Sequence, residues 1–305
     1  MNRTGLYNEF ITVKRRFEKK YQPKVERALM PDGLIQVVKA HGLHAGVNHL
    51  RGVIHNEDLM ITIRSLYVDV GVKHAQMNYS RMRDELRLKK SFSLDTDTKE
   101  AFSKASFQTK GFGFNPTWTR FVLDYLQRFL IQQITFEVST TTRDQMLKVL
   151  NQAITEGWGI DQTVKALEDL PFTKMQAARI VRTEVNRAAN VGAAAQAKTF
   201  PYQQWKEWIS AEDSRVRGTD PKDHASHVAL DGIRINEDDV FKDPRNGDLL
   251  EFPCDIHASA ESTVNCRCSH AYTAKRDANG RLIPKRQTTT VIFPNQNRNR
   301  LTVTI

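Results

Sequence analysis

The sequence predicts an α+β protein: a mostly helical N-terminal region followed by a small mixed α/β C-terminal domain and an extended basic tail. Through most of the first 200 residues, apolar side chains recur at steps of three and four, the period of a helix. After residue 203, short apolar or β-branched runs alternate with turn residues, which indicates strands. We divide the chain into residues 1–115, a helical region with a basic arm; 116–200, a second helical region; 201–275, a small α+β domain; and 276–305, the tail.

The helical elements follow from apolar spacing and from their terminating residues. Residues 5–30 are predicted to form an exposed, basic amphipathic helix, and residues 58–90 a second helix with a charged end. Residues 91–117 are rich in Ser, Thr, Gly and Phe and indicate a loop or an extended arm. An apolar stripe predicts another helix from residue 116. Shorter helices are expected over Met146–Ile154, with an N-cap among residues 140–142, then over Asp161–Leu170 and the alanine-rich Met175–Ala197.

Two strands are expected in the C-terminal domain and two in the tail. Gln204–Ile209 and Ile233–Ile235 indicate the first pair, with a turn at Asp231-Gly232 before the second strand. Thr288–Phe293 and Leu301–Ile305 are β-branched segments that resemble strands able to add to the sheet of a partner protein.

Positive charge is concentrated at the two ends of the chain. The net charge is +10, of which residues 1–30 carry +5 and residues 271–305 carry +6, so the middle is nearly neutral. Basic ends on a neutral body favour contact with a polyanion, because phosphate neutralisation releases counterions. The alternative is that the basic ends only aid solubility. The candidate nucleic-acid-binding residues are Lys14, Arg15, Arg16, Lys19, Lys20, Lys285 and Arg286.

Composition also limits the cellular setting. No run approaches the roughly 20 apolar residues of a membrane helix, and the polar start of the chain contains no secretory apolar segment. We therefore expect a cytosol-like compartment and no membrane association. The three cysteines, Cys254, Cys266 and Cys268, form an odd set that argues against a disulfide framework. Metal ligation, burial or a reactive thiol remain.

A cluster of histidines and cysteines is the sharpest chemical feature. Imidazoles and closely spaced thiols are the ligands that zinc prefers in a closed tetrahedral site. The expected ligands of a structural zinc ion are His227, Cys266 and Cys268, with His224 as the fourth, and Cys254 is expected to stand outside the site. The C-x-C spacing departs from the usual C-x₂₋₄-C of zinc sites. An alternative is therefore that the two cysteines bind no metal and pack as small apolar groups on one face of a strand.

A catalytic interpretation uses the same region. An alternative function is a metal-dependent nuclease or other hydrolase, because three acids, Glu207, Glu212 and Asp213, lie near two histidines in the sequence. Turn and capping roles explain these acids equally well. The chain contains no phosphate-binding loop, dinucleotide fingerprint or H-E-x-x-H motif. We expect no enzymatic activity. His41, His44 and His49 are expected to be surface residues.

Several motifs in fixed order give the chain a family resemblance. They are Ala178–Glu184 with Asn186 and Asn190, Trp208–Arg217, His227–Gly232, Phe252–Asp255 and Ala260–Cys268. Over roughly residues 140–270 the chain resembles the phage Mu F-like, or phage head morphogenesis, family of minor head proteins. Two departures stand out. Gly218–Ser226 is inserted, which adds His224, and the family's Pro-Gly-Asp is here Pro253-Cys254-Asp255.

The resemblance implies a bacteriophage virion protein. Such proteins lie inside the head near the portal and act in assembly and in DNA packaging or ejection. The implied partners are the portal protein, the major capsid protein, or both, with packaged double-stranded DNA bound non-specifically and several copies in each virion. Assembly would take place in the host cytoplasm. The alternative outside any virion is a plain nucleic-acid binder with salt-sensitive affinity.

The motif residues are expected to have structural roles. Charge-assisted hydrogen bonds from acids and arginines would hold the loops of the small domain. Side chains of the alanine-rich helix would form local ion pairs or dock that helix on the domain, with a solvated helix face as the alternative. The residues concerned are Arg182, Glu184, Asp213, Arg215, Arg217, Asp231, Gly232 and Asn265.

Overall fold

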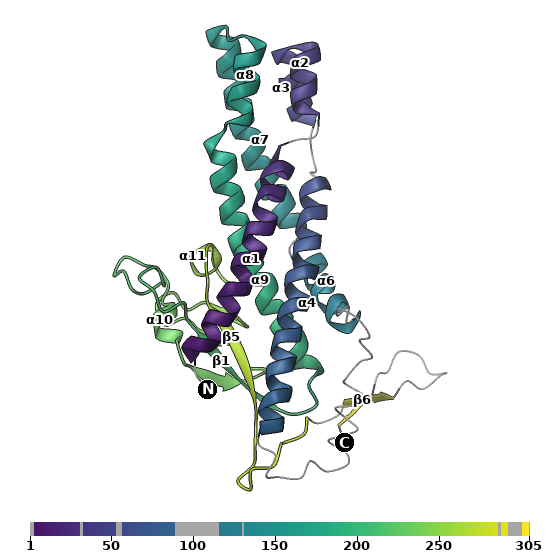
Figure 1. Ribbon diagram of the computed structural model, residues 1–305, viewed down its shortest axis with the longest axis vertical. Helices are drawn as coiled ribbons and strands as arrows, with labels where there is room; N and C mark the ends of the chain where they lie inside the picture. The colour runs from purple at the N-terminus through teal and green to yellow at the C-terminus, as the bar shows by residue number, and fades with distance from the viewer. Residues whose placement is uncertain are drawn as a thin grey trace.

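Long helices run side by side along the longest axis of the molecule, and a small sheet lies at one end (Figure 1). The computed structural model describes residues 3–30, 33–52, 57–88, 116–129, 131–285, 288–291 and 301–304. The arm expected over residues 91–117 falls almost entirely outside this set, as does Arg286. The α+β fold class is confirmed: the N-terminal part is helical, and the strands follow residue 203.

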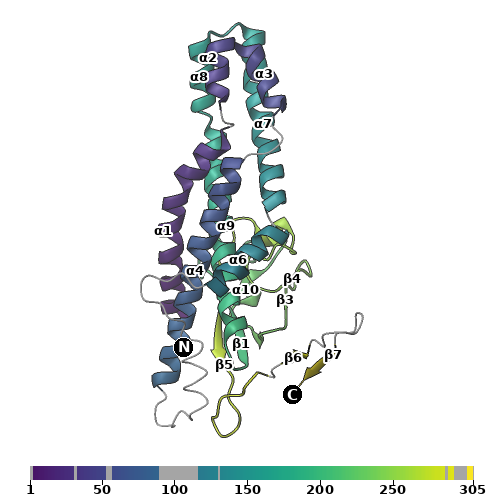
Figure 2. The same ribbon diagram turned by 90° about the vertical axis from the view of Figure 1, so that its right-hand side faces the viewer.

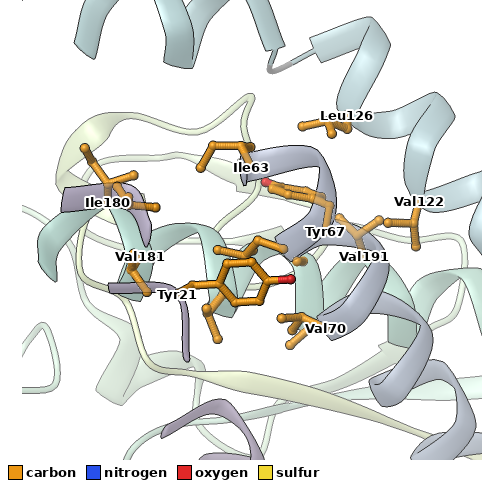
Figure 3. Close-up of a cluster of buried hydrophobic side chains, with 14 of the residues drawn as sticks. Tyr21, Ile63, Tyr67, Val70, Val122, Leu126, Ile180, Val181 and Val191 are labelled. Carbon is orange, nitrogen blue, oxygen red and sulfur yellow. The ribbon is translucent and has the colours of Figure 1, made fainter. Parts of the chain in front are cut away.

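Four helices form the central bundle around one apolar core. They are α1 (Arg3–Leu29), α4 (Glu57–Leu88), α6 (Pro116–Phe129) and α9 (Pro171–Thr199). Figure 3 shows part of the core, in which Tyr21 from α1, Tyr67 from α4 and Val181 from α9 meet. Residues from the expected segments 1–115 and 116–200 thus share a single core.

Helix α1 is not the exposed helix that its basic composition predicts. Phe10, Tyr21 and Val25 are buried against the rest of the molecule, because apolar residues at helical spacing draw a stripe along one side of α1. The remaining sides carry the exposed basic residues. The helix is therefore a core element with a charged outer surface.

A second core closes the end of the molecule far from the sheet (Figure 2). Helices α2 (Leu34–His41), α3 (Leu43–Gly52), α7 (Ile131–Glu156) and α8 (Ile160–Glu168) meet there. Gly42 joins α2 to α3 with a φ of 82°, a backbone conformation that suits glycine. Leu50 and Leu150 lie in this core, whereas His41 and His44 are exposed, as expected of surface residues.

The C-terminal region is built on a three-stranded antiparallel sheet in the order β2-β1-β5. Strand β1 (Gln204–Ile209) has the predicted bounds, β2 (Arg234–Asn236) begins one residue later than predicted, and β5 (Ser269–Ala274) pairs with all of β1. The helices α10 (His227–Leu230) and α11 (Ala260–Thr263) and the strand pair β3 (Phe241–Lys242) and β4 (Leu249–Leu250) complete the region.

The two tail strands pair with each other. Strands β6 (Thr288–Val291) and β7 (Leu301–Thr304) form an antiparallel pair, which supplies within the chain the pairing that the sequence suggested a partner would provide. Within the described residues, no helix has the length and apolar character needed to cross a membrane.

The sheet region is attached to the bundle by side chains of both. Phe252 lies in the main helical core, where its ring centroid is 5.9 Å from that of Tyr125 in α6. Strand β5 lies along α9 and near the end of α4 (Figure 1). The chemistry-bearing residues of the C-terminal region therefore sit at the junction with the helices.

Candidate metal centre

His227, Cys266 and Cys268 come together in the interior of the C-terminal region. Their ligand atoms all lie within 4.8 Å of one another. Nδ1 of His227 is 3.6 Å from Sγ of Cys266 and 3.6 Å from Sγ of Cys268. Each side chain is at most 2% exposed. The sequence predicted these three residues as a ligand set, and the fold places them in one cluster.

Local backbone geometry explains how two distant segments meet. His227 is the first residue of α10, whose N-cap Ser226 accepts a hydrogen bond from the Ala229 backbone N–H. Asn265 adopts a φ of 58°, a turn conformation that Asn tolerates better than most residues. Its backbone N–H donates to Thr183 Oγ1 on α9 at 3.0 Å. This turn directs the Cys266–Cys268 segment back under α10 toward β5.

Apolar side chains seal the cluster. The Trp208 ring meets the His227 ring edge-on with centroids 5.1 Å apart, and Phe241 lies at the same distance from Trp208. Leu230 and Leu250 belong to the same buried group. Nε2 of His227 has no hydrogen-bond partner among the described residues, so the two sulfurs are the polar atoms found near this buried imidazole.

The three thiols have different acidities. A hydrogen bond from the Cys266 thiol lowers the pKa of Cys268 against the opposing effect of burial, and the Ala211 backbone amide adds to this. Burial raises the pKa of Cys254 well above the ordinary thiol value. Cys268 is therefore closer to ionisation than Cys254.

His224 and Cys254 both stand outside the group of three ligand atoms, as the sequence predicted for Cys254 but not for His224. His224, expected as the fourth ligand, is exposed and is not part of the cluster, because the polar inserted loop carries it toward solvent. Cys254, expected outside the site, is fully buried in the same apolar group as Cys266 and Cys268. Its Sγ donates to the Thr263 carbonyl at 3.3 Å and lies 3.9 Å from the Cys266 carbonyl oxygen.

Lys14 is a buried component of the site and not a DNA contact. Its side chain is 1% exposed, and burial lowers its pKa to about 8. Nζ donates to Asn186 Oδ1 at 2.5 Å, to Ser269 Oγ at 2.6 Å and to the Cys268 carbonyl at 3.4 Å. The sequence did carry a signal, since Lys14 lies in phase with Phe10 and Tyr21 on the buried stripe of α1.

Polar residues of α9 fasten the loop that carries Cys254. Arg187 Nε donates to the Cys254 carbonyl at 2.8 Å, and Asn190 Nδ2 donates to the Pro253 carbonyl at 3.0 Å. Glu184 pairs with Arg187 at 2.6 Å and accepts from the Tyr67 hydroxyl at 2.6 Å. This part of α9 therefore docks on the C-terminal region and is not a solvated face.

Arginine and aspartate side chains connect the surrounding loops. Asp213 accepts two hydrogen bonds from Arg267 and lies 3.6 Å from Arg215. Arg217 donates to the Val264 carbonyl, and Arg182 contacts Asn265 Oδ1 at 3.4 Å.

The Asp231-Gly232 turn before β2 adds a further contact between the loops and the sheet. Asp231 accepts from the Ser210 backbone N–H at 2.8 Å, and Gly232 turns with a φ of 76° before β2. The motif residues quoted from the sequence are thus engaged in contacts between loops, strands and α9.

Only some of the basic candidates face solvent. Arg15, Arg16 and Lys19 are exposed on α1. Lys20 is also exposed, but its ammonium group forms an ion pair with Asp69. Lys285 pairs with Glu237 at 2.5 Å and donates to the Ala197 carbonyl at 2.9 Å, so an internal contact occupies the ammonium group that was expected to meet DNA.

Comparison with known proteins adds a family to this geometry. The family model described as "Phage Mu protein F like protein" matches residues 144–271. Residues 144–271 belong to the phage Mu protein F-like family. The resemblance proposed from the sequence is confirmed. No curated protein and no solved structure matches the chain.

The Mu F-like region runs from within α7 to within β5 and contains the whole His-Cys cluster. Lys14, which touches that cluster, lies outside the matched region. The family indicates a phage protein of head morphogenesis. Helices α1 and α4, which form the bundle with α9, lie outside the matched residues.

Proposed function

We propose that this protein is a structural minor head protein of a tailed phage, located inside the head near the portal and acting in assembly and in DNA packaging or ejection. The family match over residues 144–271 is the observation that carries the proposal. The elongated bundle supports it, because long helices expose large lateral surfaces for packing on other head proteins (Figure 1).

The buried cluster supports a structural role over a catalytic one. A metal-dependent hydrolase needs an open coordination position and a path for substrate. His227 is only 1% exposed and lies beneath Trp208. Of the acids that suggested a nuclease, Asp213 is held by Arg267. Purified protein incubated with DNA and divalent metals should cause no cleavage, and cleavage that His227→Ala abolishes would contradict the proposal.

The exposed basic side of α1 supports contact with packaged DNA. Arg15, Arg16 and Lys19 lie within two turns of the helix and face solvent. Replacing all three with glutamine should weaken DNA binding equally for unrelated sequences. It should also lower the slope of log affinity against log salt by up to about 3, since each lost phosphate contact removes about 0.9. An unchanged slope in filter-binding assays would place the DNA contact elsewhere or show that there is none.

The location in the head is tested in an infected host. The protein should be found in isolated procapsids and virions, and chemical cross-links from α1 or α4 should reach the portal protein. The triple glutamine variant of α1 is the matched control: it should still enter procapsids, because core positions such as Tyr21 and Val25 are unchanged. Absence of the protein from both immature and mature heads would overturn the proposal.

A further inference from the structure

The separation of atoms in the cluster matches a bound metal better than it matches packing alone. A tetrahedral zinc ion with Zn–S of about 2.3 Å and Zn–N of about 2.0–2.1 Å places its sulfur and nitrogen ligands about 3.6 Å apart. Nδ1 of His227 is 3.6 Å from both Cys266 Sγ and Cys268 Sγ. Both sulfurs therefore lie at the distance from Nδ1 that a shared zinc ion would require.

The fourth ligand is a cysteine that the sequence pattern did not select. We propose that His227, Cys254, Cys266 and Cys268 bind one zinc ion in a closed tetrahedral site. Cys254 lies close to this group: its Sγ is 3.9 Å from the Cys266 carbonyl oxygen, and all three cysteines belong to the same buried cluster. A set of one imidazole and three thiolates is a donor combination that structural zinc uses.

Backbone conformation supports the assignment of Cys254. Its φ of 65° lies in the left-handed region, where a side chain other than Asn, Asp or Gly is unfavourable. Such strain persists where the surroundings compensate for it, commonly at functional sites. Hydrogen bonds from Arg187 and Asn190 hold the loop in place, and the side chain that this strain positions is a thiol directed into the cluster.

Cys254 Sγ lies outside the group of ligand atoms within 4.8 Å of one another, so its side chain would have to turn to reach the metal. Its S–H donates to the Thr263 carbonyl at 3.3 Å. As a ligand Cys254 would be a thiolate, so its proton would pass to solvent and this hydrogen bond would be lost. The same loss of a proton occurs at Cys266 and Cys268, so one zinc ion displaces three protons while His227 binds as the neutral imidazole.

Lys14 supplies the charge that such a site requires. One Zn²⁺ with three thiolates has a net charge of −1, which is unfavourable in an apolar interior without a counter-charge. The Lys14 ammonium donates to the Cys268 carbonyl and to Asn186 Oδ1, and the amide of Asn186 donates to Cys254 Sγ at 3.0 Å. With Lys14 protonated, the buried group is neutral. The cation comes from α1, so the metal centre fastens the N-terminal helix to the C-terminal region.

The direct test is the metal content and ligand set of the full-length protein. After expression with added zinc and removal of loosely bound metal, we expect one zinc ion per chain. X-ray absorption should show three sulfur neighbours at about 2.3 Å and one nitrogen at about 2.0–2.1 Å. Protein without zinc would overturn the proposal, as would a site with two sulfurs. The measurement uses purified wild-type protein, so its result is independent of whether the protein is found in phage heads.

Variants separate ligation from folding. Cys254→Gly suits the backbone conformation at this position and should lower zinc affinity at least about tenfold, a loss no smaller than that of an outer-shell partner. Its X-ray absorption should show two sulfurs. Lys14→Met should also weaken zinc binding, whereas Arg15→Met, next to it but exposed, and His224→Ala should leave zinc affinity unchanged. Wild-type affinity in Cys254→Gly, or lost affinity in His224→Ala, would contradict this ligand set.

Discussion

Buried polar side chains determine how the two halves of the molecule are connected. Arg187 is paired with Glu184, but most of the buried cations that hold the C-terminal region use neutral oxygens instead. Lys206, fully buried, donates to the Asp239 and Glu251 carbonyls at 2.6 and 2.7 Å. Lys14 uses an amide, a hydroxyl and a carbonyl in the same way. Hydrogen bonds to a charged group contribute more than neutral ones, so each lysine fixes the position of the backbone that it contacts.

The Asp213–Arg267 pair should make stability depend on acidic pH. Hydrogen bonds from Arg267 lower the pKa of Asp213 to about 2 from an ordinary 3.8. A carboxylate with a depressed folded-state pKa stabilises the protein above its unfolded pKa and loses that contribution as pH falls through the folded value. Asp213→Asn should therefore lower Tm at pH 7, and the difference from wild type should shrink between about pH 4 and about pH 2.

Thermal melts followed by circular dichroism across this pH range provide the measurement. Arg215→Gln removes the longer, exposed contact to Asp213 at 3.6 Å and should change Tm less than Asp213→Asn does. A difference between Asp213→Asn and wild type that stays constant down to pH 2 would show that the ion pair does not account for the effect.

Residue types predicted which three side chains would cluster, whereas the proposed fourth ligand and the position of Lys14 needed the structure. Three members of the cluster could be identified from the sequence, because histidines and cysteines are rare and here lie near recognisable turns: His227, Cys266 and Cys268. Cys254 was missed because its spacing from Cys266 fits no common ligand pattern. His224 was included because it is near His227 in sequence, yet neighbours in a loop need not share a direction. Lys14 was assigned to DNA from its charge, although its helical phase placed it on the apolar stripe.

At the scale of elements, the closest helix contact is the crossing of α4 and α9. A Cβ atom added to Gly192 would lie 1.9 Å from the Gly71 carbonyl oxygen. A Cβ on Gly71 would in turn meet Val122 of α6 at 2.8 Å. Cβ contacts this short essentially never occur, so the backbones of α4 and α9 can approach here because Gly192 has no side chain, and Gly71 leaves room for Val122. Buried alanines at Ala188 and Ala195 extend the same narrow surface.

Gly192→Ala should therefore destabilise the protein, although alanine normally favours a helix interior by about 1 kcal/mol over glycine. The backbone of α4 must move to admit the methyl group, and overpacking of this kind costs about 1–3 kcal/mol or more. The free energy of unfolding from urea titrations gives the value. Gly159→Ala, at a position with open space around its Cβ, should change it by less than about 1 kcal/mol. Equal stability of the two variants would contradict the close crossing.

The longer helices followed from the sequence, whereas α2, α3, the helix boundaries and the packing did not. Strand β1 was predicted with its observed bounds because its turn-rich flanks are distinct. The N-cap expected among residues 140–142 lies instead within α7, where Thr142 is buried and donates to Gln176 at 3.1 Å. A threonine suits a helix start locally, but a tertiary contact with another helix is decided by residues far away in the sequence.

At the scale of the whole molecule, the helical bundle and the sheet region form one structural unit. Phe252 completes the bundle core, Lys14 reaches the cysteine segment, and α9 fastens the Cys254 loop. The division at residue 200 that the change of composition suggests is therefore not a division in packing. Composition reports the local secondary structure of each segment, whereas the shared core depends on side-chain contacts between segments.

This integration predicts that the protein unfolds in a single step and that residues 201–275 do not fold alone. In the isolated fragment, Phe252 would lose the helical core, and the Pro253 and Cys254 carbonyls would lose their donors on α9. Full-length protein should give coincident urea transitions by far-ultraviolet circular dichroism, which reports the helices, and by fluorescence of Trp208, which reports the sheet region.

A variant that retains Trp208 as its one tryptophan isolates that fluorescence signal. The half-buried Trp158 and Trp205 are replaced with phenylalanine, as is Trp118, whose Nε1 donates to Thr199 Oγ1 at 3.0 Å and which needs a separate stability control. The fragment, with and without zinc, should show no cooperative transition, because its three thiols and imidazole would still lack Lys14, Asn186 and the surfaces of α1 and α9. Two separated transitions in the full chain, or a cooperatively folded fragment, would show that the sheet region is an independent domain to which the helices are merely attached.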